Sequence, residues 1–273
     1  MTASHTRPSV IIVIPCYDEA ARLAVETLVA FQLPRRRVDL VFVNDGSRDG
    51  TLRLLEDMRT RAPERIGVVD LVRNSGKAEA VRQGIVHALE RSPDYIGFWD
   101  ADLATPLTEL APFCGILDTR PAVQMVLGSR VRLMGRAIER KAHRHYFGRV
   151  FATAASLVSD LPIYDTQCGA KLFRVSDTLR QVFASPFLSR WVFDVEIITR
   201  LRVTMAAHGV EIGPAIYEMP LREWRDVGGS KVHLADAVQA FVDLARIRRD
   251  LLCGSERAGR AGWQAAPTST RTG

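Results

Sequence analysis

An unbroken run of five β-branched residues, Val10 to Ile14, constrains the fold of this chain more than any other feature. Such a run favours a strand that is buried on both faces, as the strands of parallel sheets are. Further apolar runs predict strands at 38–43, 66–71, 95–99 and 123–127, and the segments between them predict helices at 18–33, 51–61, 77–90 and 106–117. This alternation predicts an α/β fold with a doubly wound, mostly parallel sheet.

The second half of the chain has a less regular pattern. It predicts a long helix at 136–159, a strand at 170–175, a helix at 192–207, a strand at 210–219 and an amphipathic helix at 234–252. We expect one domain over 10–252, with a flexible terminus at 1–9 and a disordered tail at 253–273. The composition, which is 47% hydrophobic, supplies enough apolar side chains for the core of such a domain.

The positive charge of the chain is concentrated in one segment. The formal net charge is +6, and the segment from Arg130 to Arg149 holds six Arg and one Lys against Glu139 alone. That segment therefore accounts for the whole excess. Such a concentration predicts one anionic partner at one place and disfavours general binding of nucleic acid.

The cysteines and the hydropathy of the chain indicate a cellular compartment. Cys16, Cys114, Cys168 and Cys253 are scattered without a CxxC pair, which predicts neither a zinc site nor a disulfide framework and fits a reducing cytosol. The first nine residues lack the apolar core of a signal peptide, and no stretch reaches the roughly 18 apolar residues of a membrane span. We expect a cytoplasmic protein that is soluble or held peripherally at a membrane face.

Two carboxylates, Asp100 and Asp102, directly follow the apolar, aromatic strand at 95–99. Alternate residues of an extended chain point to the same side, so both carboxylates can converge on one point. That point lies at the carboxyl end of a strand, where open α/β sheets bind ligands. Two hard oxygen ligands without a neighbouring Cys or His suit Mg²⁺ or Mn²⁺, which also bind substrate phosphates. The alternative is a solvated turn, in which Asp is common.

Three further loops leave the first three predicted strands and should lie at the same edge of the sheet. Their charged side chains include Glu19, Asp45, Asp49 and Lys77. Acids can accept hydrogen bonds from a nucleobase or ribose and a lysine can bind phosphate, which predicts a nucleoside diphosphate beside the metal. The chain lacks the GxGxxG and GxxxxGK(S/T) motifs of other nucleotide sites. The alternative is that these loops are only helix caps and turns.

Through the motifs in these loops, the chain resembles the family-2 inverting glycosyltransferases of the GT-A fold. The similar donor-site motifs are Pro15–Glu19, Val43–Thr51 and Asp100–Asp102. Three later motifs are similar to those of dolichyl-phosphate β-glucosyltransferases and their prokaryotic polyprenyl-phosphate relatives: Asp165–Phe173, Arg190–Glu196 and Gly229–Lys231. The resemblance implies a GT-A domain in which 10–130 binds the nucleotide sugar and 131–252 binds the acceptor.

The resemblance also implies roles for single residues. Pro15, Tyr17, Glu19 and Asp45 would hold the uridine, Lys77 would lie near the base or the diphosphate, and Asp100 and Asp102 would bind the metal and the diphosphate. The sequence departs from the family at Asp18, where Asn is usual, and at Ala78–Glu79, where small glycines are common. Eukaryotic members also have an amino-terminal membrane anchor, which we do not find in this sequence.

A stripe of arginines predicts where the acceptor binds. Arg132, Arg136, Arg140 and Arg144 recur every four residues. On a helix they would stack like charges on one face, each pair costing roughly 0.2–0.5 kcal/mol, so the stripe favours a bound anion. Because arginine suits bidentate binding of phosphate, we predict that Arg130, Arg140 and Arg144 bind the phosphate of the acceptor. The alternative is a solvated helix face. The apolar side chains that follow the stripe would form either core or an approach for a lipid tail.

Two acids and two tryptophans of the second half are further candidates. Asp165 and Asp194 would shape the acceptor or sugar pocket, and either could act as the general base if the acceptor were a hydroxyl. Trp191 and Trp224 would stack on the sugar or the acceptor, or else belong to the core.

The carboxyl-terminal part adds three weaker signals. Lys231 and the glycines before it predict a loop that closes over the diphosphate. His233 could reach the metal. The basic end of the helix at 234–252 suits either an anionic membrane surface or packing onto the sheet.

The leading hypothesis is a Mg²⁺- or Mn²⁺-dependent enzyme that transfers glucose from UDP-glucose to a polyprenyl phosphate with inversion. The choice of glucose depends on the resemblance. The alternatives are the same donor half acting on a soluble acceptor, a sugar-1-phosphate nucleotidyltransferase, and a binding protein that has lost catalysis.

Overall fold

The computed structural model describes residues 8–34, 36–139, 153–227 and 234–253 of the chain. Its main sheet has the strand order β3-β2-β1-β4-β7-β5-β8. The strands are β1 (Val10–Cys16), β2 (Val38–Asp45), β3 (Ile66–Leu71), β4 (Tyr95–Trp99), β5 (Met125–Ser129), β7 (Ala170–Arg174) and β8 (Ile216–Pro220). All neighbouring pairs are parallel except those of β7, which runs antiparallel to both β4 and β5. The mostly parallel α/β sheet predicted from the sequence is confirmed.

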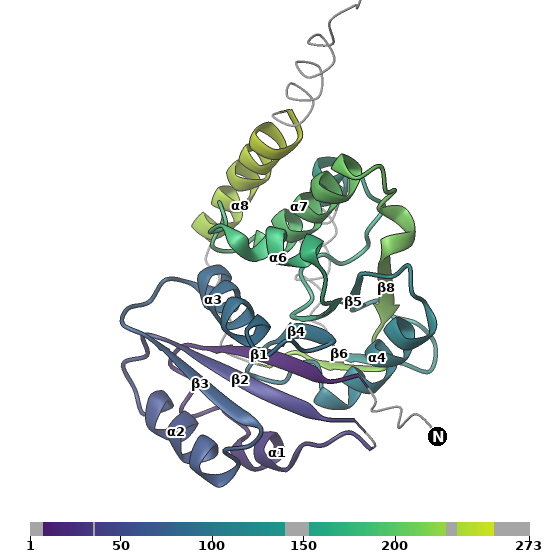
Figure 1. Ribbon diagram of the computed structural model, residues 1–273. Coiled ribbons are helices and arrows are strands. Elements are labelled where there is room, and N and C mark those ends of the chain that lie inside the picture. The colour runs from purple at the N-terminus through teal and green to yellow at the C-terminus, as the bar shows by residue number, and fades with distance from the viewer. Residues whose placement is uncertain (1–7, 35, 140–152, 228–233, 254–273) are drawn as a thin grey trace, which may run out of the picture.

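Helices cover both faces of this sheet. The helices are α1 (Val25–Ala30), α2 (Thr51–Arg61), α3 (Lys77–Leu89), η1 (Leu107–Glu109), α4 (Leu110–Thr119), α6 (Asp177–Ala184), α7 (Phe193–Ala207), η2 (Gly213–Ala215), α8 (Leu234–Ile247) and the π-helix η3 (Arg248–Cys253). In Figure 1, α3, α6 and α7 lie on one face and α1, α2 and α4 on the other. A small second sheet pairs β6 (Ala137–Glu139) with β9 (Glu223–Arg225).

Strand β1 shows why the sheet is buried on both faces. Its residues Val10 to Ile14 are at most 3% exposed. Because side chains alternate along a strand, Ile12 and Ile14 pack with α1, α2 and α4, while Ile11 and Val13 pack with α3, α6 and α7. An uninterrupted apolar run is what a strand between two helical layers requires.

The helix predicted at 18–33 is wrong over its first half, because only α1 is helical there. The N–H of Glu19 donates to Thr51 Oγ1 over 2.8 Å, and the N–H of Ala20 donates to Asp49 Oδ2 over 3.1 Å. Asp18 has a φ of 51°, in the left-handed region. These backbone amides bind the next loop, so they do not form a first helical turn.

The long helix predicted at 136–159 is also wrong at its start. Gly135 has a φ of 79°, and the N–H of Ala137 then donates to Arg222 O over 2.8 Å, so the chain enters β6. In the described part of this segment, helix is found only at 153–159. The strand predicted at 210–219 begins later, because η2 with Pro214 precedes β8.

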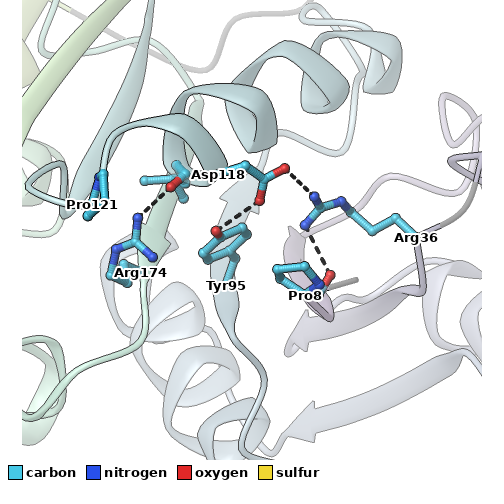
Figure 2. A pocket seen from close by; sticks show the side chains of 7 residues that line it. Pro8, Arg36, Tyr95, Asp118, Pro121 and Arg174 are labelled. Carbon is cyan, nitrogen blue, oxygen red and sulfur yellow. Dashed lines mark hydrogen bonds and ion pairs between the residues drawn. The ribbon is translucent and has the colours of Figure 1, made fainter. Parts of the chain in front are cut away.

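Two arginines flank the ring of Tyr95 at the amino end of β4. The ring of Tyr95 lies between the guanidinium carbons of Arg36 and Arg174, which are 5.6 and 5.4 Å from its centroid (Figure 2). Tyr95 and Arg36 also bind the two carboxylate oxygens of Asp118, at 3.0 and 2.5 Å. Arg174 donates to Leu117 O at the end of α4 over 2.5 Å. Positive charge at a helix C-terminus is favourable, so this cluster fastens α4 to the sheet.

We expect Arg174→Met to lower the free energy of unfolding by about 2–3 kcal/mol, because buried carbonyls lose a charged donor. Besides Leu117 O, this guanidinium donates to Val123 O over 3.2 Å. Urea denaturation measures the change. The matched control is Arg180→Met on the exposed side of α6, where the change should stay within about 0.5 kcal/mol. Equal effects of the two variants would contradict the bracing role.

Candidate active site

A cavity of ≈ 550 Å³ opens where β1, β2 and β4 reach their carboxyl ends. The residues predicted from the sequence that line it are Pro15, Tyr17, Glu19, Asp45, Lys77, Asp100, Asp102, Arg130, Trp191 and Trp224. They come from seven separate segments of the chain, and the fold brings them together. The cavity therefore lies at the edge at which α/β sheets bind ligands.

Asp45, the last residue of β2, fixes the shape of the loop between β3 and α3. One of its carboxylate oxygens accepts from the N–H of Ser75 over 2.6 Å, and the other from the N–H of Gly76 over 2.9 Å. Burial raises the pKa of Asp45, while these two hydrogen bonds act in the opposite direction. Gly76 has a φ of 93° and turns the chain into α3. The N-terminus of α3 consequently opens onto the cavity, as in other anion-binding sites.

Lys77, the first residue of α3, contacts the first aspartate of the Asp100–Asp102 pair. Its Nζ lies 2.5 Å from Asp100 Oδ1, and both side chains are about one third exposed, at 31% and 34%. Burial acts to lower the pKa of Lys77, but the charges of Asp100 and Asp194 outweigh it and raise the pKa. Burial and the charge of Asp100 raise the pKa of Asp102. Lys77 therefore stays protonated and provides positive charge within the cavity.

The carboxylate of Asp100 packs against the backbone of Gly169. A Cβ placed on Gly169 would lie 1.8 Å from Asp100 Oδ2, so the carboxylate occupies the space that any other side chain would fill. The N–H of Asp100 also donates to Gly169 O over 3.1 Å, which continues the pairing of β4 with β7. Asp100 is thus confined between Lys77 and a glycine.

Asp194 forms a buried ion pair, and its charge acts on Lys77 in the cavity. Its Oδ1 is 2.7 Å from the Nζ of Lys171, and the two side chains are 7% and 0% exposed. Lys171 also donates to Cys168 O over 2.6 Å. Burial raises the pKa of Asp194, and the charges of Lys171 and Lys77 act against that rise. The prediction that Asp194 shapes the pocket stays a prediction, because Asp194 is not among the described residues that line the cavity.

Asp165 is held in the same way by Arg130. The Nε and Nη2 of Arg130 donate to the two carboxylate oxygens, each over 2.7 Å, and the backbone N–H of Arg130 donates over 3.0 Å. Burial acts to lower the pKa of Arg130, but the charge of Asp165 raises it. The guanidinium also lies 5.4 Å from the ring centroid of Trp224. Asp165 therefore orients Arg130 at the cavity wall, although Asp165 is not itself among the described residues that line the cavity.

Several lining residues were missed at the level of sequence. They are Arg22, Asn74, Arg190 and Asp226. Arg190 reaches across from the second half of the chain and donates from Nη2 to Asn74 Oδ1 over 3.0 Å. The sequence did contain a signal for Arg190, because it lies next to Trp191 in the motif Arg190–Glu196. Arg22 and Asp226 have no such signal.

Other candidates are placed apart from the cavity or lie outside the described residues. Arg140, Arg144, Lys231 and His233 belong to the second group. Arg132 and Arg136 are exposed, and they do not share a continuous helix, since β6 follows Arg136 directly. Their stripe with Arg140 and Arg144 is therefore not helical at its start.

The site supplies an incomplete set of metal ligands. Within the part of the chain that the structure describes, no group of three or more His, Cys, Asp and Glu side chains could hold a metal. Asp100 and Asp102 provide two carboxylates, and Mg²⁺ in phosphate-binding sites typically has one or two carboxylates together with substrate phosphates. The two aspartates therefore fit a divalent ion that is also bound by a diphosphate.

The sequence was compared with known families and proteins. The family model described as "Glycosyl transferase family 2" matches residues 11–179. The dolichyl-phosphate beta-glucosyltransferase of Saccharomyces cerevisiae is 30% identical over 271 residues, which cover 90% of this chain and 76% of the yeast protein. The human enzyme of the same name is 29% identical over 268 residues, with coverage of 90% and 76%.

The fold was compared with solved structures. Glucosyl-3-phosphoglycerate synthase from Mycobacterium tuberculosis in complex with Mn²⁺ and UDP-glucose has a TM-score of 0.62 and 18% identity, and the match covers 89% of this chain and 78% of that one. The same enzyme with Mn²⁺, UDP and phosphoglyceric acid has a TM-score of 0.60 and 18% identity, with coverage of 88% and 78%. This likeness shows that the chain has the GT-A fold. None of the helices in the described ranges has the length and apolar character needed to cross a membrane.

Proposed function

The chain belongs to glycosyltransferase family 2 and is a glycosyltransferase, and from this premise we propose that it transfers glucose from UDP-glucose to a polyprenyl phosphate. The names of the relatives support a dolichyl-phosphate type of acceptor and a glucosyl group. The observation on which the proposal most depends is that Tyr17, Asp45, Lys77, Asp100 and Asp102 line one cavity at the carboxyl edge of the sheet.

The donor would bind along the first half of the chain. Pro15, Tyr17 and Glu19 follow β1 and would hold the uridine together with Asp45. The diphosphate would lie at the N-terminus of α3, where the helix dipole and Lys77 both favour an anion. Its negative charge would then lie next to the two aspartates.

The pair Asp100 and Asp102 would hold the divalent ion. When bound, Mg²⁺ or Mn²⁺ would neutralise the charge that develops on the departing diphosphate. Complexes of the structural neighbour with Mn²⁺ and UDP-glucose support this choice of ion. Lys77 would supply a further positive charge to the same leaving group.

The transfer step needs no strong base from the protein. A phosphate oxygen of the acceptor would attack the anomeric carbon on the face opposite to UDP, the bond from that carbon to the UDP oxygen would break, and UDP would leave with the electron pair. A phosphate monoester is largely ionised at neutral pH, its second pKa being about 6. The ion pairs of Asp165 with Arg130 and of Asp194 with Lys171 are consistent with a step that needs no base, because neither carboxylate is free to accept a proton. We propose that they position their partners and do not abstract a proton.

The acceptor would enter from the side of the second half. Arg130, Arg190 and Trp191 line the cavity there. Asp165 already binds two nitrogens of Arg130, so this guanidinium would meet a phosphate in a fixed orientation. Arg140 and Arg144 remain predicted ligands of the acceptor phosphate. A soluble phosphate-bearing acceptor is the second candidate, supported by the complex of the neighbour with phosphoglyceric acid.

The proposal is tested by release of UDP from UDP-glucose with Mn²⁺ or Mg²⁺, with and without a short polyprenyl phosphate. We expect release that depends on the lipid, and Asp102→Ala should lower its rate by at least about 100-fold, because charge on the leaving group is no longer neutralised. The matched control is Asp57→Ala on α2, whose carboxylate is 59% exposed and lies 3.7 Å from Arg61. It should release UDP at the wild-type rate.

The other results of this assay separate the alternatives. Release that phosphoglycerate stimulates and the lipid does not would overturn the lipid acceptor and leave the donor site in place. Formation of UTP and glucose 1-phosphate from UDP-glucose and added pyrophosphate, without release of UDP, would indicate a nucleotidyltransferase. A wild-type protein that neither binds nor cleaves UDP-glucose would overturn the glucosyl assignment.

A further inference from the structure

The ion pair between Lys77 and Asp100 occupies the place that the proposed function gives to the metal. The ammonium Nζ is 2.5 Å from Asp100 Oδ1. We propose that Lys77 is the resident cation of the free enzyme: it blocks Asp100 against a bare metal ion and moves to the diphosphate when metal and nucleotide bind together. This inference rests on the proposed function and adds an order of binding to it.

The first reason is that two cations bound to one carboxylate oxygen repel each other. Mg²⁺ binds oxygen ligands at about 2.0–2.1 Å, so an ion on Asp100 would lie next to the position of the ammonium. The two positive charges would repel each other strongly in a site that is only one third exposed to water. The ammonium of Lys77 already forms an ion pair with this carboxylate, at 2.5 Å from Oδ1. A bare metal ion must therefore displace Lys77 before it can bind Asp100.

The second reason is that Asp100 is fixed while Lys77 can move. Oδ2 of Asp100 fills the space beside Gly169, and the backbone of Asp100 is paired with Gly169 O. Lys77 has a long side chain with several rotatable bonds, and it starts at the open N-terminus of α3. An exchange of partners consequently moves the lysine and leaves the carboxylate in place.

The third reason is that a bound nucleotide would bring new partners for Lys77. The charge of Asp194 also acts on Lys77, but Lys171 already pairs with Asp194 at 2.7 Å. The charge of Arg22 acts to lower the pKa of Asp102. The guanidinium of Arg22 cannot accept a hydrogen bond from Lys77. A diphosphate at the N-terminus of α3 would supply acceptors for the ammonium and further ligands for the metal. The free enzyme should therefore prefer the metal–nucleotide complex to the bare ion.

The test measures binding of Mn²⁺ alone, from the electron paramagnetic resonance signal of free Mn²⁺, and binding of UDP at saturating Mn²⁺ by calorimetry. We expect Lys77→Gln to bind Mn²⁺ alone at least about tenfold more tightly than wild type, because the competing charge is gone. The same variant should bind UDP with Mn²⁺ at least about tenfold more weakly, because the diphosphate loses a cation. Lys77→Met serves as a second variant, and both should keep the wild-type thermal transition.

The control for net charge is Arg82→Gln on the same helix, where Arg82 pairs with Glu79 at 2.6 Å. It should change neither affinity. An affinity for Mn²⁺ alone that is unchanged or weaker in Lys77→Gln and Lys77→Met would overturn the inference. If UDP binding alone weakened, Lys77 would be an ordinary phosphate ligand and the proposed function would stand. A wild-type protein that fails to bind UDP at saturating Mn²⁺ would instead overturn the proposed function.

Discussion

Replacing Gly169 with alanine should lower kcat/KM for UDP-glucose by at least about 100-fold, because a displacement of about 1 Å in an active site can have that effect. The new Cβ would lie 1.8 Å from Asp100 Oδ2 and 2.1 Å from its Cγ. The strands cannot separate to make room, because the N–H of Asp100 is bound to Gly169 O. The carboxylate must therefore rotate away from Lys77 and from Asp102. Steady-state kinetics with UDP-glucose measure the loss.

Gly115→Ala is the matched control for this variant. Gly115 lies inside α4, and a Cβ there would meet nothing within 4 Å. This change should leave kcat/KM unchanged and raise the free energy of unfolding by about 0.4–1 kcal/mol, as is usual for glycine to alanine in a helix. Gly169→Ala should change stability little, because the displaced carboxylate can turn to solvent. Wild-type kinetics in Gly169→Ala would contradict the confinement of Asp100.

Lys171→Met should lower the free energy of unfolding by about 3–5 kcal/mol, the usual result of removing one partner from a buried ion pair. Lys171 is completely buried and Asp194 is 7% exposed, so the carboxylate would be left in the core without its cation. Chemical denaturation measures the loss. Arg61→Met is the control, since the pair of Arg61 with Glu26 is exposed and its removal should change stability far less.

The pH dependence of the free energy of unfolding of Lys171→Met tests whether the charge of Asp194 causes its loss of stability. Burial already raises the pKa of Asp194, and without Lys171 less opposes that rise. A carboxyl group whose pKa is higher in the folded state favours folding at low pH and loses that contribution as the pH rises through its folded value. The destabilisation should therefore be smaller at pH 5 than at pH 8. A loss independent of pH would point to packing and not to charge.

A double variant separates stability from catalysis. Lys171→Met with Asp194→Leu replaces the pair by apolar side chains, which is often neutral or stabilising. It should recover most of the lost stability. Its activity should be below that of the wild type, because the charge of Asp194 no longer acts on Lys77. Full recovery of activity would show that the pair serves the fold alone.

Features of the site that follow from local pattern were predictable from the sequence. Val10 to Ile14 and the aspartates after 95–99 are a buried strand and a strand end, and each is recognised within a few residues. The edge at which Asp45, Lys77 and Asp100 meet follows from the direction of parallel strands. The placement of these side chains in one cavity agrees with the sequence, while their chemical roles stay predictions.

What the sequence did not predict depends on partners far along the chain. Lys171 reads as an ordinary strand residue, because nothing near it indicates a buried carboxylate at Asp194. The amides of Glu19 and Ala20 leave the predicted helix because side chains about thirty residues later bind them. Ala137 enters a strand because the carbonyl of Arg222 is beside it. Each difference comes from a tertiary contact that outweighs local propensity.

The antiparallel strand β7 also determines when the sheet can be completed during synthesis. It lies between β4 and β5, so these two strands, which follow one another in the chain, do not pair with each other. A nascent chain that has emerged as far as β5 still has an open edge at β4 until Ala170–Arg174 has left the ribosome. Unpaired edges of this kind are prone to association with other chains. The interval between β4 and β7 is therefore the stage of translation at which we expect a chaperone to matter most.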